Sequence, residues 1–273
     1  MFHDDGPERP REGVPWGSDQ PPPPAREVEE PREATAEWRG RDLVIGTILA
    51  TGPYLLLWLL VWLVPAEEAA PEAADPGPGA ILVILFIQIS VQLWMAGVVV
   101  VMARRRGITL ASLGLRMPNW RTIWLILPTW LGAYFAFALY LGGLALAEQI
   151  TGADLGELAE GNPVPVDEDF TTTVWIVLGI SVVLAAPVVE ELFFRGLLFR
   201  GLDARLPSFL AMVLSGFAFS LVHQNIAVLI PFTVIGILLA WSYRATGSLW
   251  TPIGAHLLVN GVAFTLTVMG VEA

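Results

Sequence analysis

The chain contains no cysteine and no lysine, because all of its 15 basic residues are arginine. Without cysteine there are no disulfide bonds, thiolate metal ligands or cysteine nucleophiles. Without lysine there are no Ser–Lys catalytic pairs and no Schiff-base chemistry. Histidine is scarce, with only His3, His223 and His256 in the chain. Catalysis or binding must therefore rest on carboxylates, hydroxyls, amides and a few imidazoles.

The composition is also unlike that of a soluble protein. The 273 residues are 55% hydrophobic with a mean hydropathy of +0.62, whereas soluble domains are about 45–50% apolar with glycine included. This indicates an integral, multi-pass membrane protein. The arginines are scattered and form no basic patch, so we expect no nucleic-acid partner. Residues 1–42 lack the apolar stretch of a secretory signal, so the first membrane helix should direct insertion.

Residues 1–38 differ from the rest of the chain. They hold eight of the 21 prolines, among many acidic residues and few large apolar ones. Such a segment cannot bury enough apolar surface to offset the entropy lost on ordering. We therefore expect a disordered, acidic, proline-rich cytoplasmic tail.

Seven apolar stretches follow, each near the length of about 20 residues that a helix needs to cross a bilayer. They are Leu43–Val64, Ala80–Met102, Thr122–Leu146, Thr172 to about Leu198, Ser208–His223, Ile226–Tyr243 and Trp250–Met269. The predicted fold is an all-α, polytopic membrane bundle of about seven transmembrane helices. Residues 39–171 should form the first three helices with their loops, and residues 172–270 a membrane core of four helices, which holds the candidate catalytic residues described below.

The arginines also predict the orientation of the bundle. Loops 65–79 and 147–171 carry only acidic charges, while the arginines precede helix 1 or follow helices 2, 4 and 6. Arginine-rich loops stay on the cytoplasmic side of a membrane. The N-terminus should therefore be cytoplasmic, and an arginine-only, Ala-, Gly- and Pro-rich chain is typical of a bacterial cell membrane protein.

Two adjacent carboxylates, Glu190 and Glu191, interrupt the fourth apolar stretch, which also contains Pro187. An acidic residue at the centre of a bilayer costs about 2.5–3.5 kcal/mol, so such residues usually have a function. Glu191 and Arg195 are four residues apart in the favourable order for a helical ion pair. Glu190 points about 100° away and has no local partner. Pro187 predicts a kink just before the pair.

Two further polar pairs lie in the C-terminal apolar stretches. Phe219 precedes His223 by four residues, and His256 precedes Asn260 by the same spacing, which places each pair on one helix face. A single histidine on an apolar helix is more often a packing residue than a ligand. Polar side chains in membrane helices usually face the interior of the bundle and contact one another, however. We therefore expect the glutamate pair and these two polar pairs to lie close together.

Together these motifs resemble the CAAX protease and bacteriocin-processing (CPBP, or Abi) family of intramembrane proteases. The resemblance covers about residues 172–264 and rests on Glu-Glu-x-x-x-Arg, Phe-x-x-x-His and His-x-x-x-Asn in that order. It implies that Glu190 and His223 activate the attacking water. It also implies that His256 and Asn260 hold the oxyanion, with Glu191 in the site and Arg195 and Phe219 supporting it.

The residues themselves are compatible with that reaction. Amide hydrolysis needs a base for water and a donor for the oxyanion, and a carboxylate in an apolar site is a better base near neutral pH. Glu190, His223 and His256 are also candidate ligands of one divalent metal, such as zinc. The metal-free mechanism is favoured, because a ligated His256 could not also serve the oxyanion.

Expected partners are the lipid bilayer and a membrane protein or lipidated peptide substrate. Two other classes of function stay open. An idle bacteriocin-immunity or binding protein could keep the same site without hydrolysis, and a proton-coupled carrier could use Glu190, His223 and His256 as a relay.

Overall fold

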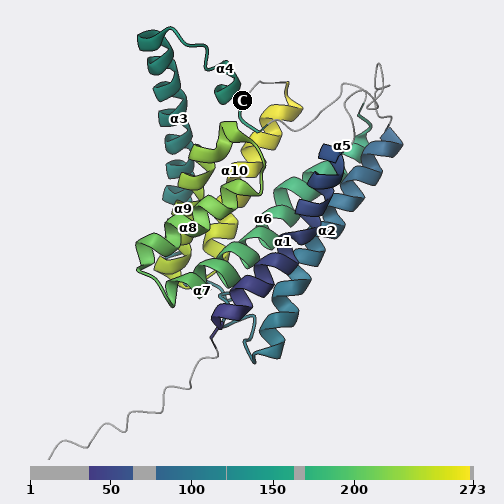
Figure 1. Ribbon diagram of the computed structural model, residues 1–273, viewed down its shortest axis with the longest axis vertical. Helices are drawn as coiled ribbons and strands as arrows, with labels where there is room; N and C mark the ends of the chain where they lie inside the picture. The colour runs from purple at the N-terminus through teal and green to yellow at the C-terminus, as the bar shows by residue number, and fades with distance from the viewer. Residues whose placement is uncertain (1–36, 64–77, 121, 163–169, 271–273) are drawn as a thin grey trace, which may run out of the picture. The chain divides into compact units, whose positions relative to one another are not determined.

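A computed structural model describes residues 37–63, 78–120, 122–162 and 170–270. The predicted tail, except for its last two residues, and most of loop 65–79 lie outside these ranges. Every regular element in the described ranges is helical, with no strand among them (Figure 1). The chain from Thr35 onward forms one compact unit. The all-α fold is confirmed, and the division at residue 171 stays a prediction.

The helices occur in the order that the hydropathy pattern predicts. The N-terminal half contains α1 (Gly40–Leu63), α2 (Pro78–Arg105), η1 (Ile123–Leu125), α3 (Ile126–Thr151) and α4 (Gly156–Ala159). One long helix then comprises α5 (Thr172–Gly179), η2 (Ile180–Ala185), α6 (Ala186–Glu191), η3 (Leu192–Phe199) and α7 (Arg200–Asp203). The last helices are α8 (Ser208–Leu221), η4 (Ile226–Val228), α9 (Leu229–Thr246) and α10 (Trp250–Val268).

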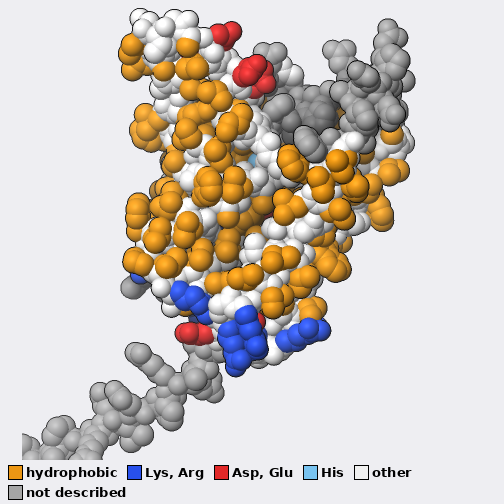
Figure 2. Space-filling model, in the orientation of Figure 1, with side chains coloured by type: hydrophobic (Ala, Val, Ile, Leu, Met, Phe, Trp, Pro, Cys, Tyr) orange, Lys and Arg blue, Asp and Glu red, His pale blue; other side chains and the backbone are white. Residues whose placement is uncertain are grey.

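Six of these helices are long and apolar enough to cross a membrane, which confirms an integral multi-pass protein. The predicted fifth helix is the exception, because α8 has only 14 residues and ends at Leu221 instead of His223. The short α4 lies inside a predicted loop. Large apolar side chains are exposed along the long helices (Figure 2), as expected where lipid is the solvent.

The long helix lies at the centre of the packing. Its α6 segment contacts both α2 and α10, while α1 packs on α2 and α3 packs on α9 and α10 (Figure 1). Helices α8 and α9 approach most closely at Gly216 and Gly236, where a Cβ added to Gly216 would lie 2.6 Å from the carbonyl oxygen of Thr233. Only glycine permits this contact, and it brings the backbone of α9 against the long helix.

The long helix departs from α geometry on both sides of the glutamate pair. Segments η2 and η3 are π-helical, with the α-helical α6 between them. In η2 the N–H of Ala186 bonds the carbonyl of Ser181, five residues back. Pro187 follows and has no N–H to give. The predicted disturbance at Pro187 is therefore a change of helical register, of the kind often found at functional sites.

Figure 2 shows the visible arginines of the described bundle at one end, whereas acidic side chains lie at both ends. Exposed arginines occur around the start of α1 and at the end of α2, and they are Arg39, Arg41, Arg104 and Arg105. Exposed acids Glu157 and Glu160 lie in and just after α4, at the other end of the bundle. This arrangement is consistent with the predicted topology, in which the N-terminus and the α2–α3 loop share one side.

Candidate active site

The predicted ion pair between Glu191 and Arg195 is present and fully buried. Nε of Arg195 lies 3.1 Å from Oε2 of Glu191, and both side chains have 0% exposed area. Nη1 of Arg195 donates to Oε1 of Glu191 at 3.1 Å, and Nη2 donates to the carbonyl of Gly236 at 3.0 Å. Arg195 therefore ties the glutamate helix to α9 and neutralises one of the two carboxylates.

Glu190 has no such partner. Its side chain is 16% exposed, and its Oε2 atom is buried without a hydrogen-bond donor among the described residues. Nε2 of His256 lies 3.9 Å from this oxygen, which is too far for a direct hydrogen bond. A separation of this size suits a water molecule or a substrate atom between the two groups. Glu190 is thus the free carboxylate that the sequence predicts.

His256 lies between the two glutamates. Its Nδ1 atom is 3.0 Å from Oε1 of Glu191, while its Nε2 atom faces Glu190. Because the carboxylate of Glu191 can only accept, Nδ1 carries the proton of this hydrogen bond.

His223 approaches the same place from the other side of Phe219. The ring of Phe219 lies 5.0 Å from the ring of His223, 5.5 Å from that of His256 and 5.0 Å from the guanidinium of Arg195. His223 lies in the turn after α8, next to Gln224, which has a positive φ of 54°. Its Nδ1 atom donates to the carbonyl of Phe219 at 2.9 Å, so neutral His223 keeps a lone pair on Nε2.

Asn260 is on the same helix as His256 but contacts a different part of the long helix. Its side-chain amide donates to the carbonyl of Val182 at 2.9 Å. One of the two amide hydrogens is used in this bond, and the other remains available. The structure therefore gathers Glu190, Glu191, His223 and His256 around Phe219 and Arg195. Asn260 lies one turn along α10 and ties that helix to η2.

The two histidines have one feature that is typical of metal ligands. Metal-bound histidines usually donate their second nitrogen to a carboxylate or a carbonyl, as His256 and His223 do. The positions do not fit, however. Across residues 37–63, 78–120, 122–162 and 170–270, no three His, Asp or Glu side chains are grouped so as to hold a metal ion. We therefore derive no step through a metal.

Sequence comparison relates this segment to a known family. Residues 172–262 match the sequence profile of the family described as type II CAAX prenyl endopeptidase Rce1-like. The resemblance to the CAAX protease family is confirmed for this segment. The match begins at the first residue of α5 and includes all three motifs of the family resemblance, from Glu190 to Asn260.

A relative of the chain is also known. A Bacillus subtilis protein named "Putative membrane peptidase YdiL" is 30% identical over 131 residues, which cover 48% of this chain and 52% of the relative. The chain thus spans about half the length of the curated relative that it matches. No solved structure matches the chain significantly.

The CAAX protease-like segment is completed by residues that the sequence analysis missed. Tyr54 of α1 lies within electrostatic range of Glu190, although α1 precedes the family match by more than a hundred residues. Phe232 of α9 lies with its ring 4.7 Å from that of His223. Neither residue belongs to a motif, so no sequence signal distinguished them from ordinary apolar packing.

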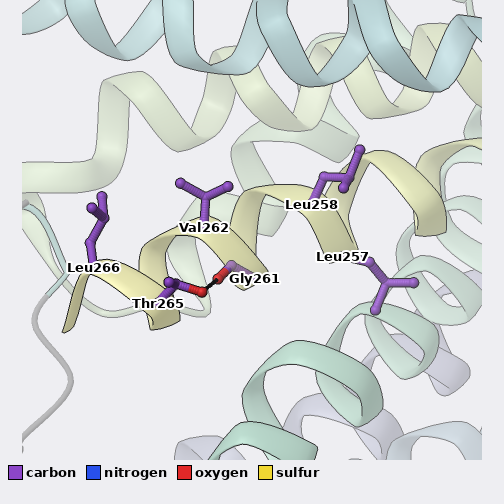
Figure 3. Close-up of a pocket in the computed structure, with 6 residues that line it drawn as sticks. All are labelled: Leu257, Leu258, Gly261, Val262, Thr265 and Leu266. Atoms are coloured by element: carbon purple, nitrogen blue, oxygen red, sulfur yellow. Dashed lines mark hydrogen bonds between the residues drawn. The ribbon is translucent and has the colours of Figure 1, made fainter. Parts of the chain in front are cut away.

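An apolar groove runs along α10 beyond the site (Figure 3). It has a volume of about 250 Å³ and is lined by Leu257, Leu258, Gly261, Val262, Thr265 and Leu266. The hydroxyl of Thr265 donates to the carbonyl of Gly261 at 2.7 Å, so it offers no free donor. The groove can contact an apolar chain, but its lining contains no group for catalysis.

Proposed function

We propose that this protein is an intramembrane endopeptidase that hydrolyses peptide bonds of membrane proteins or lipidated peptides with a water molecule activated by Glu190 and His223. The observation that carries the proposal is the buried oxygen of Glu190, which has no hydrogen-bond donor among the described residues, beside a second carboxylate that forms a buried ion pair with Arg195. The buried ion pair gives Glu191 and Arg195 a structural role. No such role accounts for the carboxylate of Glu190, since an acidic residue in an apolar core costs about 2.5–3.5 kcal/mol.

In the first step, the water hydrogen-bonds to the carboxylate of Glu190 and to Nε2 of neutral His223. Glu190 removes one proton while the water oxygen attacks the carbonyl carbon of the substrate. This forms a tetrahedral oxyanion and a protonated Glu190. His223 accepts the hydrogen bond from the second water hydrogen and orients the attacking lone pair. The Phe219 carbonyl fixes the tautomer of His223 that makes this possible.

The oxyanion is held by His256 and Asn260. With Glu191 bound to Nδ1, an imidazolium at His256 presents its Nε2–H toward the space beside Glu190. The second amide hydrogen of Asn260 donates from one turn along α10. Such donors typically contribute about 10²–10³-fold to kcat each. In the last step the C–N bond breaks, and protonated Glu190 returns its proton to the leaving amine.

The test compares membrane proteomes. Cells that lack the gene would be restored with the wild-type chain, with Glu190→Gln, or with Glu157→Gln as the matched control, since Glu157 is exposed in α4. We expect one or more membrane proteins to be shortened with wild-type and Glu157→Gln and to stay intact with Glu190→Gln. Identical proteomes in all three strains, with equal protein amounts, would exclude a protease and leave a binding protein or a carrier.

A further inference from the structure

The segment just before α1 is bound to the helix that carries the glutamates. Trp38 is only 3% exposed, and its indole Nε1–H donates to the carbonyl of Gly196 at 2.8 Å. The carbonyl of Trp38 in turn accepts from Arg205, which follows the same helix. Trp38 is far outside residues 172–262, the segment that matches the CAAX protease family.

The register of the helix explains why the carbonyl of Gly196 is available. At the end of η3 the N–H of Arg200 bonds the carbonyls of Arg195 and Leu197, but not that of Gly196, which lies between them. From Arg200 onward the helix is α-helical. The carbonyl of Gly196 is passed over in this change and needs another donor. Trp38 supplies it.

Two other carbonyls near the glutamates receive side-chain donors in the same way. Asn260 of α10 donates to Val182 at 2.9 Å, and the hydroxyl of Ser215 in α8 donates to Phe194 at 3.2 Å. Side chains from three separate parts of the chain thus hold the π-helical segments. Such segments are rarely stable without help from their surroundings.

The start of α1 packs closely on the glutamate helix. A Cβ added to Gly201 would clash with the side chain of Leu43, and one added to Gly46 would lie 2.8 Å from Cδ2 of Leu197. The first turns of α1, which follow Trp38, therefore lie directly against η3 and α7.

We propose that Trp38 is a positioning residue for the active site. Its N–H fixes the peptide of Gly196, which directly follows Arg195. Arg195 holds Glu191, and Glu191 holds Nδ1 of His256. Loss of the N–H would let η3 change its hydrogen-bond register, which would rotate the side chain of Arg195. The side chains of Glu191 and His256, which Arg195 orients, would then shift as well. This inference rests on the proposed protease function for its kinetic readout.

The experiment uses a matched pair of tryptophans in the full-length protein. Trp94 of α2 also donates its indole N–H to a backbone carbonyl, that of Leu49, at 2.8 Å, but on the lipid-facing surface. With a cleaved substrate from the proteome comparison, Trp38→Phe should lower kcat about 10-fold or more, with little change in KM, because a small misplacement of catalytic groups is costly. The dependence of kcat on pH should also shift. Trp94→Phe should match the wild type in both respects.

A second variant separates positioning from packing. Site-specific β-(3-benzothienyl)alanine at position 38 keeps the shape of the indole and removes only the N–H donor. It should fold as the wild type does and show the same loss of kcat as Trp38→Phe. If kcat and the pH profile stay at wild-type values while only thermal stability falls, Trp38 is a packing residue and the inference is wrong.

A spectroscopic readout does not depend on activity. The chain has three histidines, so ¹⁵N-histidine NMR spectra can be assigned with His256→Gln. The His256 signals should move when the position 38 donor is removed and stay unchanged in Trp94→Phe. Unmoved His256 signals would overturn the inference. An inactive wild type with moved signals would overturn the protease proposal alone.

Discussion

The side-chain amide of Asn260 donates a hydrogen bond of 2.9 Å to the carbonyl oxygen of Val182. Ala186 bonds the carbonyl of Ser181 in the five-residue register. If that register continued by one residue, Pro187 would bond Val182, but only with an N–H. Proline has none. Asn260 therefore replaces the donor that Pro187 lacks, and it joins α10 to the helix of the glutamates. This contact gives Asn260 a structural task in addition to its proposed role at the oxyanion.

The two tasks of Asn260 can be separated. Asn260→Leu leaves the buried carbonyl of Val182 unpaired, which should lower stability by about 1–3 kcal/mol. It also removes an oxyanion donor, which should lower kcat about 10²–10³-fold. Adding Pro187→Ala supplies a backbone N–H for Val182. We expect the double variant to regain thermal stability but not activity, as measured by thermal unfolding and by cleavage.

Recovery of activity in the double variant would contradict the oxyanion role. In that case Asn260 would act only through the helix register. The single variant Pro187→Ala serves as the control, and it should cleave at a rate close to that of the wild type.

Substitution of the two glutamates should have different effects. Glu190→Gln keeps the size of the side chain and removes the base, so we expect a normally folded protein without activity. Glu191→Gln leaves the fully buried charge of Arg195 without a counter-ion and should destabilise the fold by about 3–5 kcal/mol. Thermal unfolding in detergent and cleavage assays would measure both effects, with Glu157→Gln as the exposed control.

A stable but inactive Glu191→Gln beside an active Glu190→Gln would reverse the assignment of the base. Cleavage at the wild-type rate by both variants would remove the glutamates from the chemistry altogether.

The contacts of the glutamate pair show what local sequence can predict. The i,i+4 spacing was sufficient for the pair of Glu191 and Arg195, because both residues lie on one helix. The contact of Glu191 with His256 joins residues 65 positions apart and depends on how α10 packs on α6. The structure also brings His256 to the ring of Phe219, beside His223.

The helical register is the feature that sequence alone could not predict. Pro187 predicts a disturbed helix, but the π-helical form depends on donors from distant elements, such as Asn260 for Val182 and Trp38 for Gly196. Apolar length predicted the membrane helices well, because each is defined by its own residues. It overestimated α8, since the turn at His223 depends on contacts with η4 and with the loop before α5.

Membrane topology can be measured directly, because the chain has no cysteine. Ser112 lies between α2 and α3, Glu157 lies in α4, and both are exposed. A single cysteine at each position should react with a membrane-impermeant maleimide from opposite sides of the membrane, with position 112 on the cytoplasmic side. Labelling of both positions from the same side would contradict the predicted orientation.

The N-terminal tail should be dispensable for catalysis. Deletion of residues 1–36 keeps Trp38, which donates to the carbonyl of Gly196, and keeps Asp42, which pairs with Arg106 at 2.6 Å. We expect cleavage at the wild-type rate by the truncated protein. A deletion that also removes Trp38 should lose activity. If the first deletion inserts normally yet does not cleave, the tail recruits the substrate.

The last prediction concerns metal. Glu190, His223 and His256 carry the right atoms for a zinc site with three protein ligands, since the second nitrogen of each imidazole is held by an acceptor. Among the described residues, however, no three such side chains are grouped as ligands of one ion, and the proposed mechanism uses His256 as an oxyanion donor. A zinc-bound Glu190 would also leave the paired Glu191 as the remaining base.

We therefore expect the purified enzyme to keep its activity after a tight zinc chelator is added and removed by dialysis. Elemental analysis should find no stoichiometric metal. Activity that is lost with the chelator and restored by zinc would make His256 a ligand, and water activation would then belong to the metal.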